Sequence, residues 1–163
     1  MSVVVSNASP LINLARIQRF DLLRRFFEYI TIPTAVYEEV VVRGQERDGS
    51  LDVRNAAWIS TAVPADALAV AALTAQLDLG EASAIILARE LNADLLLIDE
   101  IRGRRIAEKL GVNVKGTLGI LARARREGLI PNLRDEIIRL QLLGTWIHPK
   151  LIRDILEIVG ETL

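Results

Sequence analysis

The sequence of 163 residues is long enough for one domain with its own core, and 51% hydrophobic but only 4% aromatic residues predict an aliphatic core. The absence of cysteine and the single histidine, His148, exclude disulfides, thiolate metal sites, thiol nucleophiles and multi-histidine metal centres. The net charge of −1 by itself neither favours nor excludes a nucleic-acid partner.

Short apolar runs alternate with helical patterns along the chain. Strands are expected where the run has no polar face, because such strands are buried on both sides. We expect strands at residues 3–6, 29–32, 58–61, 95–98 and 112–114. Helices are expected where apolar residues recur every three or four positions. We expect helices at residues 10–17, 22–27, 34–42, 65–77, 80–91, 101–110, 118–127, 132–143 and 149–159.

Capping residues mark several of these boundaries. Ser9 and Thr117 are expected to cap the helices that follow them, and Gly128 to end the helix before it. Residues 43–50, rich in charge and glycine, are expected to form a loop. The alternation of strands and helices predicts an α/β fold with a parallel sheet, built as a single domain over residues 1–163 with C-terminal helices from about 132.

The chain carries no pattern typical of a signal peptide and no apolar run that approaches the length of a membrane span. The lack of cysteine suits a reducing compartment. We therefore expect a cytoplasmic protein without a membrane segment.

Oxygen-bearing side chains occur at four places that this topology brings together. Asn7 and Asp99 each follow a buried strand, so both are expected at the carboxyl edge of the sheet. Glu81 opens a buried helix, and Glu38 and Glu39 lie on the helix after the second strand. If these side chains converge, they form the oxygen-only set that Mg²⁺ or Mn²⁺ prefers. Such an ion also removes the repulsion between crowded carboxylates.

Each of these residues also has a purely structural interpretation. Asn7 could hydrogen-bond the backbone in a turn, and Asp99 could cap the next helix. Glu81 could complement the helix dipole, and Glu38 and Glu39 could be solvated helix charges. The signal therefore lies in the set and its order.

Positive charge is concentrated in residues 102–126. The basic residues expected on helix faces there are Arg102, Arg105, Lys109, Arg123 and Arg126. Such a concentration is typical of a polyanion-binding surface, and the alternative is an ordinary solvated face. We expect these side chains to bind the backbone of a polyanion if the protein acts on one.

Five blocks of the sequence resemble, in order and spacing, the PIN-domain proteins, and more closely a prokaryotic branch of predicted nucleic-acid-binding proteins related to VapC-type toxins. The blocks are VVVSNASPLINLARI, ITIPTAVYEEV, LDLGEASAIILA, LLLIDEIRGRRIAEKLGV and VKGTLGILARARREGLIP. They span residues 3–131. The resemblance implies a three-layer α/β/α fold with a metal-dependent ribonuclease site at the edge of the sheet.

The resemblance also implies site residues and partners. The four acidic positions of the family fall on Asn7, Glu39, Glu81 and Asp99, with Glu38 as the alternative on its helix. Ser9 matches the small hydroxyl residue that accompanies the first acid. The family's toxins pair with an antitoxin and commonly form dimers, which implies both for this chain. The family's usual first residue is Asp, so Asn7 removes one negative charge from the site.

Two functions follow from these residues. The first is a Mg²⁺- or Mn²⁺-dependent endoribonuclease, a phosphodiester hydrolase and toxin of a toxin–antitoxin pair, with Asn7 as a neutral ligand. The second is a non-catalytic PIN-like module that binds RNA or protein through its positive segment. An apolar C-terminal region, with Leu142, Trp146 and Leu151 among its residues, predicts a homodimer or an antitoxin interface.

Overall fold

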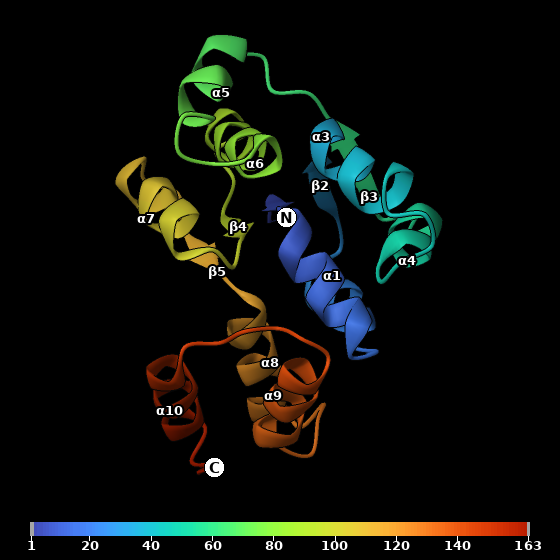
Figure 1. The fold of residues 1–163 in the computed structure, drawn as a ribbon, viewed down its shortest axis with the longest axis vertical. Coiled ribbons are helices and arrows are strands. Elements are labelled where there is room, and N and C mark those ends of the chain that lie inside the picture. The colour runs from blue at the N-terminus through green and yellow to red at the C-terminus, as the bar shows by residue number, and fades with distance from the viewer. Residues whose placement is uncertain (1, 163) are drawn as a thin grey trace.

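Five parallel strands form the central sheet in a computed structural model of the chain, which describes residues 2–162. The strands are β1 (Val4–Ser6), β2 (Ile30–Pro33), β3 (Ile59–Ala62), β4 (Leu95–Leu97) and β5 (Val114–Lys115). Their order in the sheet is β3-β2-β1-β4-β5. Helices cover both faces (Figure 1), so the three-layer α/β/α prediction is confirmed.

The helices are close to those expected from the sequence. They are α1 (Ala8–Arg16), α2 (Asp21–Phe26), α3 (Thr34–Tyr37), η1 (Glu38–Val42), α4 (Ser50–Asn55), α5 (Ala67–Leu73), α6 (Leu79–Glu90), α7 (Ile101–Lys109), α8 (Thr117–Arg126), α9 (Leu133–Leu142) and α10 (Pro149–Ile158). The short helix α4 was not expected. Between residues 2 and 162, no helix is long and apolar enough to cross a membrane.

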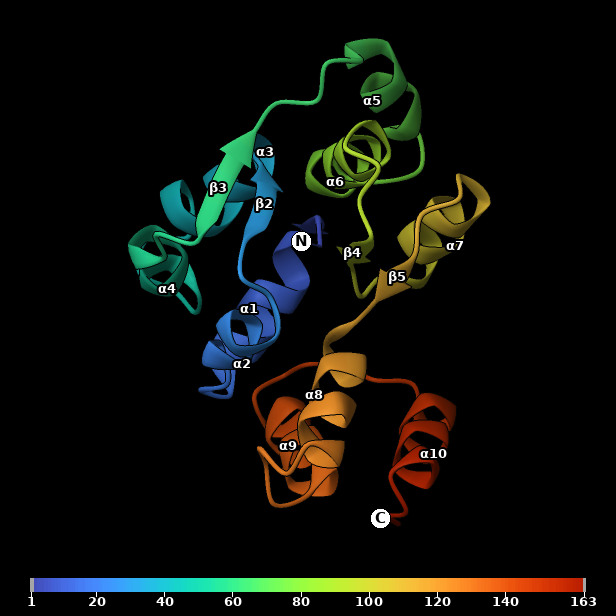
Figure 2. The same cartoon turned by 180° about the vertical axis from the view of Figure 1, so that it is seen from behind.

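Alternate residues of each central strand point to opposite faces of the sheet. Val4 and Leu97 belong to the core beneath α1, α2 and α8, whereas Val5 and Leu96 belong to the core beneath α6 and α7. Both faces of β1 and β4 are therefore buried, which explains why these strands read as continuous apolar runs. Helices α9 and α10 pack on α8, and these three gather at one end of the molecule, away from α5 and α6 (Figures 1 and 2).

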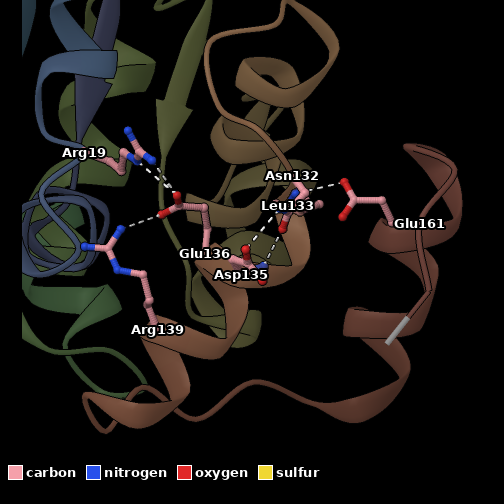
Figure 3. Close-up of polar contacts among 7 residues, drawn as sticks. All are labelled: Arg19, Asn132, Leu133, Asp135, Glu136, Arg139 and Glu161. Carbon is pink, nitrogen blue, oxygen red and sulfur yellow. Dashed lines mark hydrogen bonds and ion pairs between the residues drawn. The ribbon is translucent and has the colours of Figure 1, made fainter.

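Two carboxylates fix the C-terminal helices (Figure 3): Glu136 joins α9 to Arg19 after α1, and Glu161 joins the segment after α10 to the start of α9. Glu136 on α9 is only 3% exposed, and its Oε1 accepts hydrogen bonds from Nη2 of Arg19 at 2.7 Å and Nε at 3.1 Å. Its Oε2 accepts from Arg139 at 3.2 Å. Glu161, beyond α10, accepts from the backbone N–H groups of Leu133 and Arg134 and so caps the start of α9.

We expect Glu136→Ala to lower the free energy of unfolding by about 2–3 kcal/mol, because a buried pair is broken while its arginines stay partly solvated. Urea unfolding measures the change. The control is Glu127→Ala, which removes the exposed pair between Arg123 and Glu127 and should cost less than about 1 kcal/mol. Equal effects for the two variants would show that Glu136 does not anchor α9.

The helix expected at residues 34–42 is interrupted, and this prediction needs correction. After α3 the chain widens into the π-helix η1, in which the N–H of Arg43 donates to the carbonyl of Glu38 at 2.8 Å. Gly44 follows, where a β-carbon would lie 1.9 Å from the carbonyl oxygen of Val40. The apolar spacing of this segment could not reveal the extra residue, because one wide turn leaves Val36, Val40 and Val41 buried.

Candidate active site

The polar residues lie at the ends of two paired strands, β1 and β4, whose following connections run to opposite sides of the sheet. The chain leaves β1 toward β2 on one side and leaves β4 toward β5 on the other, while β1 and β4 are paired. In open α/β sheets this switch point leaves a crevice outside the carboxyl ends of the strands. Asn7 follows β1 there and is 3% exposed, with its backbone N–H donating to the carbonyl of Leu97 at 2.9 Å.

Asn7 makes a contact across this crevice and not with the local backbone. It occupies the N-cap position of α1, ahead of the helix start expected at residue 10, yet its side chain makes no capping hydrogen bond. Its Nδ2 donates instead to Oε2 of Glu100 at 3.3 Å, and the Ser9 hydroxyl donates to Oε1 of Glu100. The backbone-turn interpretation of Asn7 is therefore not what the structure shows. Glu100 is the carboxylate that faces β1.

Asp99, the metal ligand that the sequence predicts after the fourth strand, makes its hydrogen bonds with Thr117 and Asn13. Its Oδ1 accepts the backbone N–H of Thr117 at 2.6 Å, and its Oδ2 accepts from the Thr117 hydroxyl at 2.8 Å and from Nδ2 of Asn13 at 3.0 Å. Thr117 is thus the first residue of α8 and not its cap, since Gly116 takes the N-cap position. Asp99 fastens the start of α8 to the end of β4.

Two further carboxylates and an N-cap aspartate complete a group at the same edge. Glu81 is 8% exposed and forms a capping box at the start of α6, with its carboxylate accepting from the N–H of Asp78 at 3.1 Å. Gly80 adjoins both Asn7 and Asp78, because a β-carbon on it would lie 3.5 Å from Oδ1 of each. We call Asn7, Glu39, Asp78, Glu81 and Glu100 the rim cluster.

Mutual electrostatic effects show that the members of the rim cluster are neighbours. Burial raises the pKa of Glu39, and the charges of Asp78 and Glu100 raise it further, whereas Arg43 lowers it. Burial likewise raises the pKa of Glu81; the N–H of Asp78 lowers it, and the charges of Asp78, Glu100 and Glu39 raise it. Glu38 is exposed while Glu39 is half-buried, so the geometry favours Glu39 over the alternative on its helix.

A cleft of about 690 Å³ adjoins the rim cluster. Ser9, Asp99 and Glu100 line its polar end, and residues between α9 and α10 line its apolar end, including Trp146 and Ile147. The wall is completed by α8. The cleft therefore leads from the carboxyl edge of the sheet toward the C-terminal helices.

The basic residues expected from the sequence do not line this cleft. Arg102, Arg105 and Lys109 are exposed on α7. Arg123 pairs with Glu127 at 2.6 Å and lies 4.1 Å above the ring of Phe26, so it has a structural role, and Arg126 is exposed beside it. The cations that do line the cleft are Arg104 and Lys115, on α7 and β5.

A family model described as "DUF3368: PIN domain" matches residues 3–161, nearly the whole chain. The chain belongs to the PIN domain family. PIN domains are generally nucleases and generally use divalent metals. Among solved structures, this PIN domain is similar to a PilT N-terminus domain protein from the hyperthermophilic archaeon Sulfolobus solfataricus P2, with 21% identity, a TM-score of 0.47, and 75% of this chain and 92% of that one covered. The comparison with curated proteins gives no match.

The rim cluster of this PIN domain fits a hard divalent cation in its chemistry. All its possible ligand atoms are oxygens. Burial raises the pKa values of Glu39 and Glu81, and the neighbouring carboxylates raise them further, so a cation at this edge would stabilise the charged forms. Among residues 2–162, however, no three acidic or histidine side chains are arranged to hold a metal ion together. Glu81 is engaged in its capping box and Glu100 with Asn7 and Ser9, so these side chains must turn before they can converge on an ion.

Two residues of the rim cluster were missed from the sequence. Glu100 directly follows Asp99, and strand ends are uncertain by a residue or two, so the sequence could not show which neighbour faces β1. The signal for Asp78 was present, because Asp78 and Glu81 have the spacing of a capping box. His148 has a structural role at the N-cap of α10, with Nδ1 accepting from the N–H of Lys150 at 3.0 Å.

Proposed function

We propose that this PIN domain is a metal-dependent endoribonuclease in which Asn7, Glu39, Glu81 and Glu100 hold Mg²⁺ or Mn²⁺. The observation that carries the proposal is the rim cluster itself, because four separate segments of the chain bring its oxygens to the switch point of the sheet. A bound divalent cation would lower the pKa of a water molecule and neutralise charge on the phosphate under attack.

The chain's own residues have distinct parts in this proposal. Within residues 2–162, Oδ1 of Asn7 accepts no hydrogen bond and is not among the fully buried polar atoms, so it is open to a ligand. Ser9 and Asn7 orient the Glu100 carboxylate by donating to its two oxygens. The sequence-based role of Asp99 as the fourth ligand stays a prediction, and its contacts with Thr117 and Asn13 favour Glu100 in that role.

Cleavage of single-stranded RNA is expected to stop in EDTA and to return when Mn²⁺ or Mg²⁺ is added. In Glu39→Gln, the Mn²⁺ concentration for half-maximal cleavage should rise about tenfold, since one charge is lost from the ligand set. Glu38→Gln is the matched control, because it makes the same change on the adjacent, exposed residue. Cleavage that survives EDTA, or equal effects of the two variants, would contradict the proposal.

A second function has two observations in its favour. Asn7 is neutral where the resembling family has Asp, and no three carboxylates of the described chain converge. A PIN domain with this arrangement could bind RNA or protein without cleaving. RNA binding that weakens steeply with salt but does not respond to Mg²⁺ would identify this module.

We also retain a cytoplasmic location, an antitoxin partner and a homodimer as parts of the proposal. Leu142 and Ile158, on α9 and α10, are 80% and 62% exposed, and an interface with a partner at this end of the molecule would bury them. Light scattering on the isolated chain measures its mass, and a strictly monomeric mass at high concentration would remove the homodimer.

A further inference from the structure

The cleft beside the rim cluster contains two cations without a described partner. No hydrogen bond or ion pair to the side chains of Arg104 and Lys115 is present among residues 2–162, although both line the cleft and are partly buried. Partly buried cations normally have an anionic partner, because burial without one is unfavourable. The carboxylates at the same end of the cleft, Asp99 and Glu100, are engaged with other groups.

Glycine residues leave room beside both cations. A β-carbon on Gly116 would lie 2.7 Å from Nη1 of Arg104 and also 2.7 Å from Oδ1 of Asp99, and a β-carbon on Gly119 would lie 2.7 Å from Cγ of Lys115. Neither glycine has a positive φ, so the backbone conformation does not explain why glycine occurs at these two positions. The start of α8 is therefore shaped so that two long cationic side chains can lie against its backbone and reach the cleft.

An aromatic ring lies on the same cleft. Trp146 is 76% exposed, and its ring contacts His148 in a T-shaped arrangement with centroids 5.9 Å apart. A tryptophan held this far out of the core offers a stacking surface, and nucleobases stack on aromatic side chains of single-strand binding proteins. The cleft volume of about 690 Å³ lies within the roughly 300–1,000 Å³ typical of small-ligand pockets.

We propose that this cleft binds the part of a single-stranded RNA that adjoins the cleaved phosphodiester, with Arg104 and Lys115 binding phosphate and Trp146 stacking on an unpaired base. The proposal rests on the proposed function, because it takes the rim cluster as the place of cleavage. A single strand is required, since a base paired within a helix cannot present its face to Trp146. The two cations at the polar end favour a polyanion over an apolar protein segment.

Binding can be measured without cleavage. We would use a short oligouridylate in EDTA and follow the fluorescence of Trp146 in a Trp58→Phe background, which leaves Trp146 as the sole tryptophan. Base stacking is expected to quench this fluorescence. Trp146→Ala, followed by labelled RNA instead, should weaken binding about tenfold, whereas Trp146→Phe should retain most of the affinity.

The roles of Arg104 and Lys115 are tested by the salt dependence of the affinity for RNA. Arg104→Gln and Lys115→Gln should each weaken binding severalfold and reduce the slope of log affinity against log salt by about 0.7. Arg25→Gln, the same change at an exposed position on α2 outside the cleft, is the matched control and should have little effect. An oligomer of abasic nucleotides should be insensitive to Trp146→Ala but remain sensitive to the two cations.

The outcomes separate this proposal from the proposed function. A protein that binds RNA in this way but never cleaves it would retain the cleft and refute the nuclease. No measurable RNA binding, or affinity unchanged in Trp146→Ala and Arg104→Gln, would overturn the cleft proposal. A change in molecular mass in Trp146→Ala with unchanged RNA affinity would also overturn it, and would identify Trp146 as part of a protein interface.

Discussion

RNA cleavage is expected to fall by about a hundredfold or more in Glu100→Gln, because even residues that only hydrogen-bond to metal ligands typically change activity by about 10–100-fold. Gln keeps the shape of the side chain and an oxygen that can accept from Ser9 or Asn7. What it removes is the negative charge that faces the amide of Asn7. One of the two donors, Ser9 or Asn7, must turn to accept from the new amide nitrogen, so we expect a loss of about 1 kcal/mol in folding free energy beside the much larger loss of cleavage.

Asp99→Asn is the matched control for this prediction. It makes the same chemical change on the adjacent residue, but Asp99 is engaged with Thr117 and Asn13. We expect this variant to lose about 1–2 kcal/mol of folding free energy, because an amide nitrogen must replace one accepting oxygen. Its cleavage should stay within about tenfold of the unchanged protein, since hydrogen-bonding changes outside the ligand set have effects of about that size.

Single-turnover cleavage and urea unfolding on both variants give the comparison. Should the folded Asp99→Asn protein lose cleavage while Glu100→Gln retains it, Asp99 would be the ligand, as the sequence alone predicts. A loss of cleavage in only one of the two folded variants therefore identifies which of the neighbouring carboxylates binds the metal, and unchanged cleavage in both would contradict either assignment.

Asn7→Asp is expected to destabilise the metal-free protein and to tighten Mn²⁺ binding by at least about tenfold, which corresponds to about 1.4 kcal/mol. Without metal, the new carboxylate lies beside Glu100, at the position where Nδ2 now donates over 3.3 Å, and like charges repel. With metal, the same charge adds attraction to the cation. Calorimetric titration with Mn²⁺, together with RNA cleavage, measures the gain.

Asn13→Asp provides the same change of charge outside the rim cluster. Asn13 donates to Asp99 at 3.0 Å, so this variant should also be destabilised by repulsion. It should show no gain in metal affinity. If Asn7→Asp behaves like Asn13→Asp, with neither metal binding nor cleavage improved, the non-catalytic module becomes the better account of this PIN domain.

The fold could be predicted from the sequence because its strongest signals are local. Residues 3–6 and 95–98 read as buried strands since helices cover both sheet faces, and those strands are β1 and β4 at the centre. Helix α4 was missed because residues 50–55 have few apolar positions, and only Val53 among them packs into the core. The extra residue of η1 was missed because apolar periodicity is insensitive to one wide turn.

The site was harder to predict, since it depends on which way single side chains point. The sequence places Asn7 and Asp99 after buried strands of a parallel sheet and therefore at its carboxyl edge, and in the structure Asn7 and Glu81 are buried. The choice between Asp99 and Glu100 depends on where β4 ends, and the strand stops at Leu97, one residue before the expected end. The sequence did not predict that Arg104 and Lys115 line one cleft. They lie on different elements, α7 and β5, and only the fold brings both beside the start of α8.

The π-helix has a consequence for comparing this chain with its relatives. The wide turn runs from the carbonyl of Glu38 to the N–H of Arg43, so α3 keeps its register with β2 and the extra residue changes the count only between Glu38 and Gly44. A relative that lacks the insertion would keep its acid in register with β2 and bring its equivalent of Gly44 one position closer. Alignments of this family should therefore allow a one-residue gap between Glu38 and Gly44, and acids there should be matched by superposition and not by their distance from the following loop.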